Sequence, residues 1–351
     1  MIYYISTERF STTVRYFLRD NHVEPRGLLK SLTYEELFFE RAAPIGHYIF
    51  TDFDRLSRYE LECAAAFAKA LQKAAPEACI LNHPLTALER YPLLIALNKA
   101  GINDFTAIRI EGGERPKRYP VFIRAEDGYG GPETDLLHND DEYDAAIANL
   151  FQRGLPTRGR LAIGFANERS PDGYYYKYGA LNIGGRIIPQ HINYGENWVV
   201  KLNYQHAGNA ASRDEAYGES EAGVANELNY VKHNPHQDIL SRVFEIAGID
   251  FGRVDYGIVD GRVQIYEINT NPYLPYGKKH SNRTEKKPIV LNGILEALRA
   301  TNRPIGVGGR IAFEEPRPRD HNLHWPRRKL PISLARRAID RMSGRVTTVS
   351  H

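Results

Sequence analysis

The stretch that decides the fold runs Arg253-Val254-Asp255-Tyr256-Gly257, through Asp260-Gly261, into Glu267-Ile268-Asn269-Thr270-Asn271-Pro272. Side chains alternate between the two faces of a strand, so Arg253 and Asp255 share a face of the first strand. Glu267 and Asn269 likewise share a face of the second. Carboxylate and amide oxygens therefore stand where core strands usually carry apolar groups. Hard divalent cations prefer such oxygens, and the pattern predicts a divalent-cation site.

The turn at Asp260-Gly261 decides which residues of the two strands face each other. A two-residue hairpin loop would send Asp255 and Glu267 to opposite faces. A three-residue loop that starts at Val259 sets Arg253 opposite Glu267, and Asp255 then lies diagonal to Glu267 on the same face. We therefore expect an odd-length loop or an equivalent bulge.

Length and composition narrow the class of protein. The 351 residues suffice for two or three subdomains with a sizeable core, and a formal net charge of +3 is too small to indicate nucleic acid by itself. The two cysteines, Cys63 and Cys79, form no CxxC pattern, which argues against a disulfide framework or a zinc site. No apolar run has the length of a transmembrane segment and the N-terminus lacks a signal-peptide layout, so we expect a cytoplasmic protein.

The first hundred residues alternate strands and helices. Apolar runs predict strands at residues 1–6, 45–51 and 79–81, and apolar residues at helical spacing predict helices at 57–75 and 88–100. Such alternation is typical of a small parallel α/β layer. We assign this N-terminal domain to residues 1–105.

The next segment combines a strand, a cation and glycines. A strand at 120–124 delivers Arg124 and runs into a glycine-rich loop with Gly128, Gly130 and Gly131. Glycine backbone approaches an anion closely and the cation neutralises charge, which suits phosphate binding. Because the spacing matches no standard phosphate motif, an ordinary glycine-rich hairpin loop is the alternative. With a helix at 140–152, residues 106–158 form a small lid subdomain.

Residues 159–301 are expected to form the core with the metal site. We predict a strand at 160–165, a hairpin of 174–183 and 186–191 about Gly184-Gly185, a short strand at 198–201, and helices at 222–233, 237–247 and 288–301. Residues 302–351 are rich in proline and arginine. This basic tail could contact a membrane surface or a partner; the alternatives are an extended arm packed on the domain and a disordered segment.

Arg-x-Asp at 253–255, followed by Glu-Ile-Asn-Thr-Asn-Pro at 267–272, resembles the metal- and phosphate-binding end of ATP-grasp carboxylate–amine ligases such as D-alanine–D-alanine ligase and glutathione synthetase. The likeness covers most of residues 79–300. Residues 82–84 with Arg90 look like the entry to the nucleotide domain. The resemblance implies an α/β (α+β) ATP-grasp fold with an N-terminal parallel layer, a small lid and a C-terminal antiparallel-sheet subdomain.

The resemblance also implies ATP and Mg²⁺ as cofactors. Asp255, Glu267 and Asn269 would hold magnesium, with Glu267 bridging two ions, and Arg253 would steady the transferred phosphate. The implied nucleotide contacts come from the lid cation, the glycine loop, two strand lysines and the adenine hinge: Arg124, Gly128, Gly130, Gly131, Lys177, Lys201, Phe165, Ala166 and Asn167. For each lysine an exposed strand position is the alternative. For the metal site the alternative is a buried ion pair between Arg253 and Glu267.

Two positions depart from the family pattern. Arg124 stands where these ligases usually have lysine, which keeps the charge but changes the geometry. The hinge reads Gly164-Phe165-Ala166 where an acidic residue is common, so an adenine or ribose contact is either lost or supplied by Glu168. Both departures concern nucleotide affinity and leave the metal residues in place.

The implied reaction is the ATP- and Mg²⁺-dependent joining of a small-molecule carboxylate to an amine. An acylphosphate forms, the amine attacks it, and ADP and phosphate are released, with Arg253 and Lys201 as the catalytic residues. A kinase of the same fold that phosphorylates a hydroxyl, and a nucleotide-binding protein without turnover, both stay open. We expect no nucleic-acid partner. The sequence does not identify the substrates or the oligomeric state.

Overall fold

The computed structural model describes residues 1–20, 23–127, 130–200, 217–275, 285–317, 334–335 and 338–339. The chain divides into two compact units. The first comprises Met1–Ala87, Thr270–Lys278 and Leu295–His351, and the second comprises Leu88–Asn269 and Lys279–Ile294. Among the described residues, no helix has both the length and the apolar character that a membrane crossing requires.

The first unit contains a parallel sheet of four strands in the order β2 (Leu29–Thr33), β1 (Ile2–Ser6), β4 (His47–Phe50) and β5 (Ile80–Leu81). Its helices are α1 (Thr12–Asp20), α2 (Val23–Leu28), α3 (Tyr34–Glu40) and α4 (Arg58–Ala74), with short 3₁₀ turns at Glu8–Phe10 and Phe53–Arg55. The predicted parallel α/β layer is confirmed.

Helix α4 shows how the sequence builds this layer. Ser57 and Glu60 form a capping box that satisfies backbone N–H groups at the start of the helix. Cys63, Phe67 and Leu71 then recur at helical spacing and are buried in the core of the unit. The ring of Phe67 lies 5.0 Å from the ring of Tyr48 in β4, so the helix is packed onto the sheet by its apolar face.

Part of the predicted basic tail is an arm packed on the first unit. Strand β13 (Arg310–Ala312) pairs antiparallel with β3 (Ala42–Pro44). Phe313 is buried beside Phe67, with ring centroids 5.8 Å apart. Residues 302–317 therefore take the extended-arm alternative, and nearly all of the tail beyond them lies outside the described residues.

The second unit contains two antiparallel sheets. The smaller has the order β6 (Ala107–Arg109), β8 (Arg160–Gly164) and β7 (Val121–Ala125), with a 3₁₀ turn at Ile110–Gly112. Helix α6 (Asp140–Gln152) starts at Asn139, whose side chain accepts a hydrogen bond from the Glu142 N–H at 2.9 Å. Leu150 of α6 packs with Ile123 of β7.

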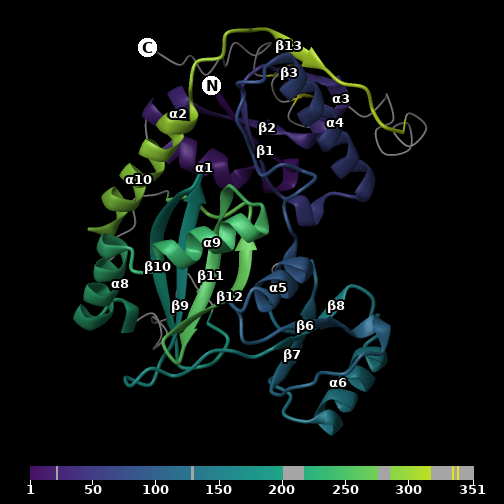
Figure 1. Cartoon of the computed structure of the whole chain (residues 1–351), viewed down its shortest axis with the longest axis vertical. Helices are drawn as coiled ribbons and strands as arrows, with labels where there is room; N and C mark the ends of the chain where they lie inside the picture. The colour runs from purple at the N-terminus through teal and green to yellow at the C-terminus, as the bar shows by residue number, and fades with distance from the viewer. Residues whose placement is uncertain are drawn as a thin grey trace. The chain divides into compact units, whose positions relative to one another are not determined.

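The larger sheet has the order β10 (Arg186–Gly195), β9 (Tyr175–Ile183), β11 (Phe251–Val259) and β12 (Arg262–Asn269), all antiparallel. The predicted hairpin about Gly184-Gly185 is present, and both glycines have positive φ. Helices α8 (Glu221–His233) and α9 (Gln237–Ala247) lie against β10 (Figure 1). Helix α5 (Arg90–Lys99) packs on α9 and β12, and α10 (Lys286–Thr301) runs from the second unit into the first.

The strand predicted at residues 198–201 is wrong. Residues 198–200 belong to no strand, and Lys201 lies outside the described residues. Trp198 instead packs against two aromatic rings, with ring centroids 5.2 Å from Phe122 of β7 and 5.7 Å from Phe165, which follows β8. Aromatic packing thus accounts for the apolar pattern that had indicated a strand.

The turn of the β11–β12 hairpin also differs from the prediction. Val259 pairs with Arg262, so the loop is only Asp260-Gly261, and both loop residues have the positive φ of a type I′ turn. The odd-length loop is therefore wrong. The expected equivalent bulge does occur: the pairing shifts between Asp255 and Tyr256, which leaves Tyr266 as the extra residue on β12.

Candidate functional site

Two carboxylates face each other across β11 and β12. Asp255 lies directly opposite Glu267, so both side chains project from the same face of the sheet. Arg253 lies opposite Asn269 rather than opposite Glu267, which corrects the predicted register. The next residue, Tyr256, projects to the other face and donates to the Tyr230 hydroxyl of α8 at 3.0 Å. The carboxylates are therefore on the face away from this helix.

Asp255 is buried and carries two cations. The Arg253 Nε lies 2.8 Å from Oδ1, and the Lys177 Nζ of β9 lies 3.4 Å from Oδ2. Burial opposes ionisation, but the charges of Arg253 and Lys177 outweigh it and keep the pKa of Asp255 below its usual value. Lys177, predicted as a phosphate contact, is thus placed beside a predicted metal ligand.

Glu267 forms ion pairs with two further cationic side chains, which come from different elements. The Arg90 Nη2 lies 2.7 Å from Oε2, and the Arg124 Nη1 of β7 lies 3.3 Å from the same oxygen. Burial again opposes ionisation, and the charges of Arg90 and Arg124 keep the pKa of Glu267 below its usual value despite the neighbouring Asp255. Both carboxylates are therefore ionised at neutral pH.

Arg90 is the residue of this group that no sequence-based prediction assigned to the site. It begins α5, and its guanidinium also donates to the backbone carbonyl of Glu126 at the end of β7. It therefore connects the start of the glycine-rich loop to Glu267. The two partners are 177 residues apart, and the only sequence signal was the family likeness at the start of the helix.

The charges of these six side chains do not cancel. Arg90, Arg124, Lys177 and Arg253 surround two carboxylates, which leaves an excess of two positive charges among them. The simple ion pair between Arg253 and Glu267 is not formed, because Glu267 pairs with Arg90 and Arg124 while Arg253 pairs with Asp255. A partly buried excess of guanidinium and ammonium groups attracts oxyanions such as a polyphosphate.

The donor set fits magnesium only together with further ligands. Among the described residues, no group of three or more His, Cys, Asp or Glu side chains is arranged to hold a metal ion. Asp255, Glu267 and the Asn269 amide supply hard oxygen donors from one face. Magnesium usually binds one or two carboxylates and completes its shell with water and phosphate oxygens. The residues therefore fit an ion that arrives with a phosphorylated ligand.

The second asparagine of the motif, Asn271, forms hydrogen bonds with buried polar groups. The Asn271 side chain donates to Asp52 Oδ1 at 2.9 Å and accepts from the Tyr4 hydroxyl at 2.7 Å. Both Asn271 and Asp52 are buried, and all three residues belong to the first unit. Asn271 therefore anchors the end of the motif two residues after Asn269.

The predicted adenine hinge is tied into the surrounding structure. The Phe165 N–H donates to the carbonyl of Pro120 at 2.9 Å, and the Ala166 carbonyl accepts from the Tyr266 hydroxyl at 2.9 Å. The Asn167 side chain accepts from the Glu168 N–H at 2.9 Å. Tyr266 is the bulged residue of β12, so the hinge and the carboxylate hairpin are connected through one hydroxyl.

The described segments on the two sides of the glycine-rich loop pair with each other. Arg124 and Val121 of β7 bridge to Pro132 and Leu137, so the chain returns alongside the strand that it leaves. Gly131 has a φ of 90°, a conformation that favours glycine. Gly130 is exposed, whereas Gly128 lies outside the described residues.

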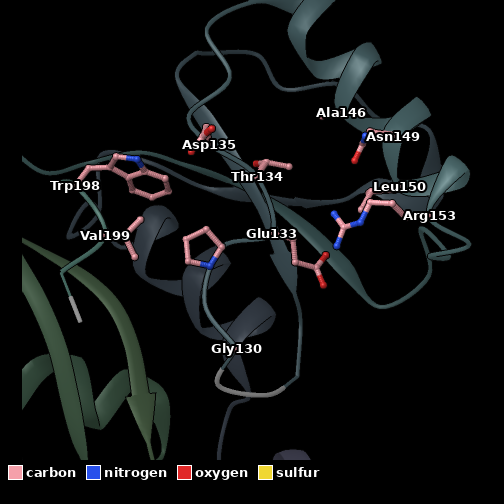
Figure 2. Close-up of a pocket in the computed structure, with 11 residues that line it drawn as sticks. Gly130, Glu133, Thr134, Asp135, Ala146, Asn149, Leu150, Arg153, Trp198 and Val199 are labelled. Carbon is pink, nitrogen blue, oxygen red and sulfur yellow. The ribbon is translucent and has the colours of Figure 1, made fainter. Parts of the chain in front are cut away.

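A cavity of about 490 Å³ lies beside this loop (Figure 2). Gly130 and Pro132 line one part of it, Trp198 and Val199 another, and Arg153 at the end of α6 a third. Glu133, which also lines it, pairs with Arg160 at 2.6 Å. Neither carboxylate of the β11–β12 hairpin lines this cavity, so it is separate from the carboxylate site.

Comparisons with known proteins find similarity among solved structures alone. No protein-family model matches the chain, and no curated protein sequence matches it. D-alanine–D-alanine ligase from Bacillus anthracis complexed with ATP has 11% identity and a TM-score of 0.46 over 86% of this chain and 98% of that one. VanG D-Ala:D-Ser ligase from Enterococcus faecalis has 12% identity and a TM-score of 0.45 over 86% and 99%. A RimK domain ATP-grasp protein from Sphaerobacter thermophilus has 14% identity and a TM-score of 0.44 over 86% and 99%.

Proposed function

We propose that the chain is an ATP-dependent ligase that joins a small-molecule carboxylate to an amine through an acylphosphate, with magnesium at Asp255, Glu267 and Asn269. One observation carries the proposal: two ionised carboxylates face each other and are surrounded by four cations. A site with hard oxygen donors and excess positive charge suits a divalent cation and a polyphosphate together. A site for a divalent cation alone would not need the four cationic side chains, and a site for a polyphosphate alone would not need the two carboxylates.

The proposed chemistry has two steps. A substrate carboxylate oxygen attacks the γ-phosphorus of ATP, and the bond from that phosphorus to the bridging oxygen breaks to release ADP. The amine nitrogen then attacks the acyl carbon, the bond from that carbon to the phosphate oxygen breaks, and the amine loses a proton. The products are an amide, ADP and inorganic phosphate.

The residues of the chain contribute binding and charge stabilisation. Bound magnesium would neutralise charge on the phosphate oxygens. Arg124 and Lys177 would bind phosphate oxygens and hold the phosphate chain, and Arg253 would stabilise negative charge on the transferred group. The hinge at Phe165 to Asn167 would receive the adenine. Lys201 keeps its proposed phosphate-binding and catalytic role, although it lies outside the described residues.

Binding of MgATP, measured by isothermal titration calorimetry, tests the nucleotide part of the proposal. We expect the unchanged protein to bind MgATP and Asp255→Asn to bind it at least tenfold more weakly, because the variant loses a carboxylate ligand. Asp260→Asn is the matched control, since Asp260 is an exposed turn residue with a φ that asparagine also adopts. Absence of MgATP binding by the unchanged protein would refute the proposal.

A screen for stimulated ADP release tests the ligase part. Mixtures of small carboxylates and amines are supplied with MgATP, and products are identified by mass spectrometry. We expect an amide together with free inorganic phosphate. A phosphorylated product without free phosphate would assign the kinase reaction instead.

A further inference from the structure

His191 lies in the same row of the sheet as the two carboxylates. Across the four strands, His191 of β10 pairs with Gly179, Gly179 pairs with Asp255, and Asp255 pairs with Glu267. Residues paired in this way project from the same face. His191 is therefore on the carboxylate face, although its sequence position gave no reason to select it.

The glycine between them determines where the imidazole lies. A Cβ built on Gly179 would come within 2.5 Å of both Cε1 and Nε2 of His191, a separation that real side chains do not adopt. These two atoms form the outer end of the ring, so the ring extends from β10 across β9. Neighbouring strands are about 4.8 Å apart, so the ring ends about one strand away from Asp255.

The neighbouring row adds two hydrogen-bond donors. Asn193 of β10 pairs with Lys177 of β9, and the Lys177 ammonium reaches Asp255 at 3.4 Å. An imidazole, a carboxamide and an ammonium group thus gather on β9 and β10 at the edge of the carboxylate site. All three can donate hydrogen bonds, and a phosphate oxyanion accepts several at once.

We propose that His191 is a further nucleotide-binding residue, which contacts the phosphate chain of ATP from the β10 side while Gly179 keeps the path of its ring open. The inference deepens the proposed function and rests on it. It also assigns a role to Gly179, whose missing side chain is the condition for the contact.

Affinities for MgATP and for adenosine test the inference. We expect His191→Ala to weaken MgATP binding about tenfold or more, as for the loss of a hydrogen bond to a charged group, and to leave adenosine binding unchanged. Gly179→Ala should weaken MgATP binding similarly, because the added methyl group displaces the ring. The double variant should bind MgATP no more weakly than whichever single variant binds it less tightly, since both changes remove the same contact. Gly112→Ala is the matched control, because a Cβ there has nothing within 4 Å.

The outcomes are separable. Unchanged MgATP affinity in His191→Ala, or an equal loss of adenosine affinity, would overturn the inference while the proposed function stands. Absence of MgATP binding by the unchanged protein would overturn both. If His191→Ala does not fold, His191→Gln, which retains a donor, should bind MgATP more tightly than Gly179→Ala, and the reverse order would refute the phosphate contact.

Discussion

Replacing Lys177 by methionine should change the affinities for magnesium and for MgATP in opposite directions. The Lys177 ammonium lies 3.4 Å from Asp255 Oδ2. Magnesium would bind such an oxygen at about 2.1 Å. If the ammonium and the ion approach the oxygen from different sides, at an obtuse angle, they would be about 5 Å apart, and the lysine would compete with free magnesium for the same carboxylate.

The magnitude follows from Coulomb's law. A single and a double positive charge 5 Å apart repel by about 7 kcal/mol at an effective dielectric constant of 20. The Lys177 side chain is 21% exposed and can turn toward solvent, so we expect about 1–2 kcal/mol of this repulsion to remain after screening and relaxation. Lys177→Met should then strengthen the binding of free magnesium by roughly five- to thirtyfold. It should weaken MgATP binding, because a phosphate contact is lost.

Calorimetric titrations with magnesium chloride alone and with MgATP supply both affinities. Lys232→Met, a change at an exposed residue of α8, is the matched control and should alter neither. Damage to the fold would weaken both affinities together, so opposite changes cannot arise from it. Magnesium affinity that falls or stays constant in Lys177→Met would refute competition between the ammonium and the ion.

Two further predictions concern carboxyl groups of the first unit, and urea unfolding at several pH values checks both. Asn271→Asp should lower the free energy of unfolding at pH 7 by about 2–4 kcal/mol, because it sets a second carboxylate against the fully buried Asp52. Burial and Asp52 would raise the pKa of the new carboxyl group, so the loss of stability should shrink as the pH falls through that pKa. Asn139→Asp, at an exposed helix cap, is the control. Equal stabilities of Asn271→Asp and the unchanged protein would contradict the prediction. Burial raises the pKa of Glu35 to about 7, so its contribution to stability is full below pH 4.5 and is lost as the pH rises through 7. Glu35→Gln should therefore be more stable than the unchanged protein at pH 8 by about 1–3 kcal/mol, and identical pH profiles would show that Glu35 titrates normally.

Local pattern predicted the elements that carry strong periodicity. Helix α4 repeats buried residues at helical spacing, and Gly184-Gly185 occupies a turn whose positive φ values favour glycine. Residues 12–40 lacked such signals: α1 has nine residues, and β2 reads Leu-Lys-Ser-Leu-Thr. Helices and strands this short are stabilised by tertiary packing more than by intrinsic preference, so their sequence carries little evidence of them.

In the candidate site, too, local pattern predicted some features, whereas contacts between distant residues could not be predicted. That Asp255 and Glu267 share a face followed from strand periodicity once a register shift was required. The partners Arg90 and Arg124 could not be placed, because their contacts with Glu267 span 177 and 143 residues. His191 was missed for a related reason: its place in the row depends on the pairing of four strands, and the register between β10 and β9 shifts after Pro189.

The bulge at Tyr266 explains how a two-residue turn and a shared carboxylate face coexist. The type I′ turn alone would have put Asp255 and Glu267 on opposite faces, and the extra residue restores the common face. The same residue sends its hydroxyl to the Ala166 carbonyl, where the proposed adenine hinge begins. If the bulge lay elsewhere on β12, only the residues farther from the turn than the bulge would return to the common face. The tyrosine hydroxyl would also move. One inserted residue therefore sets the register of the proposed metal ligands and connects them to the hinge.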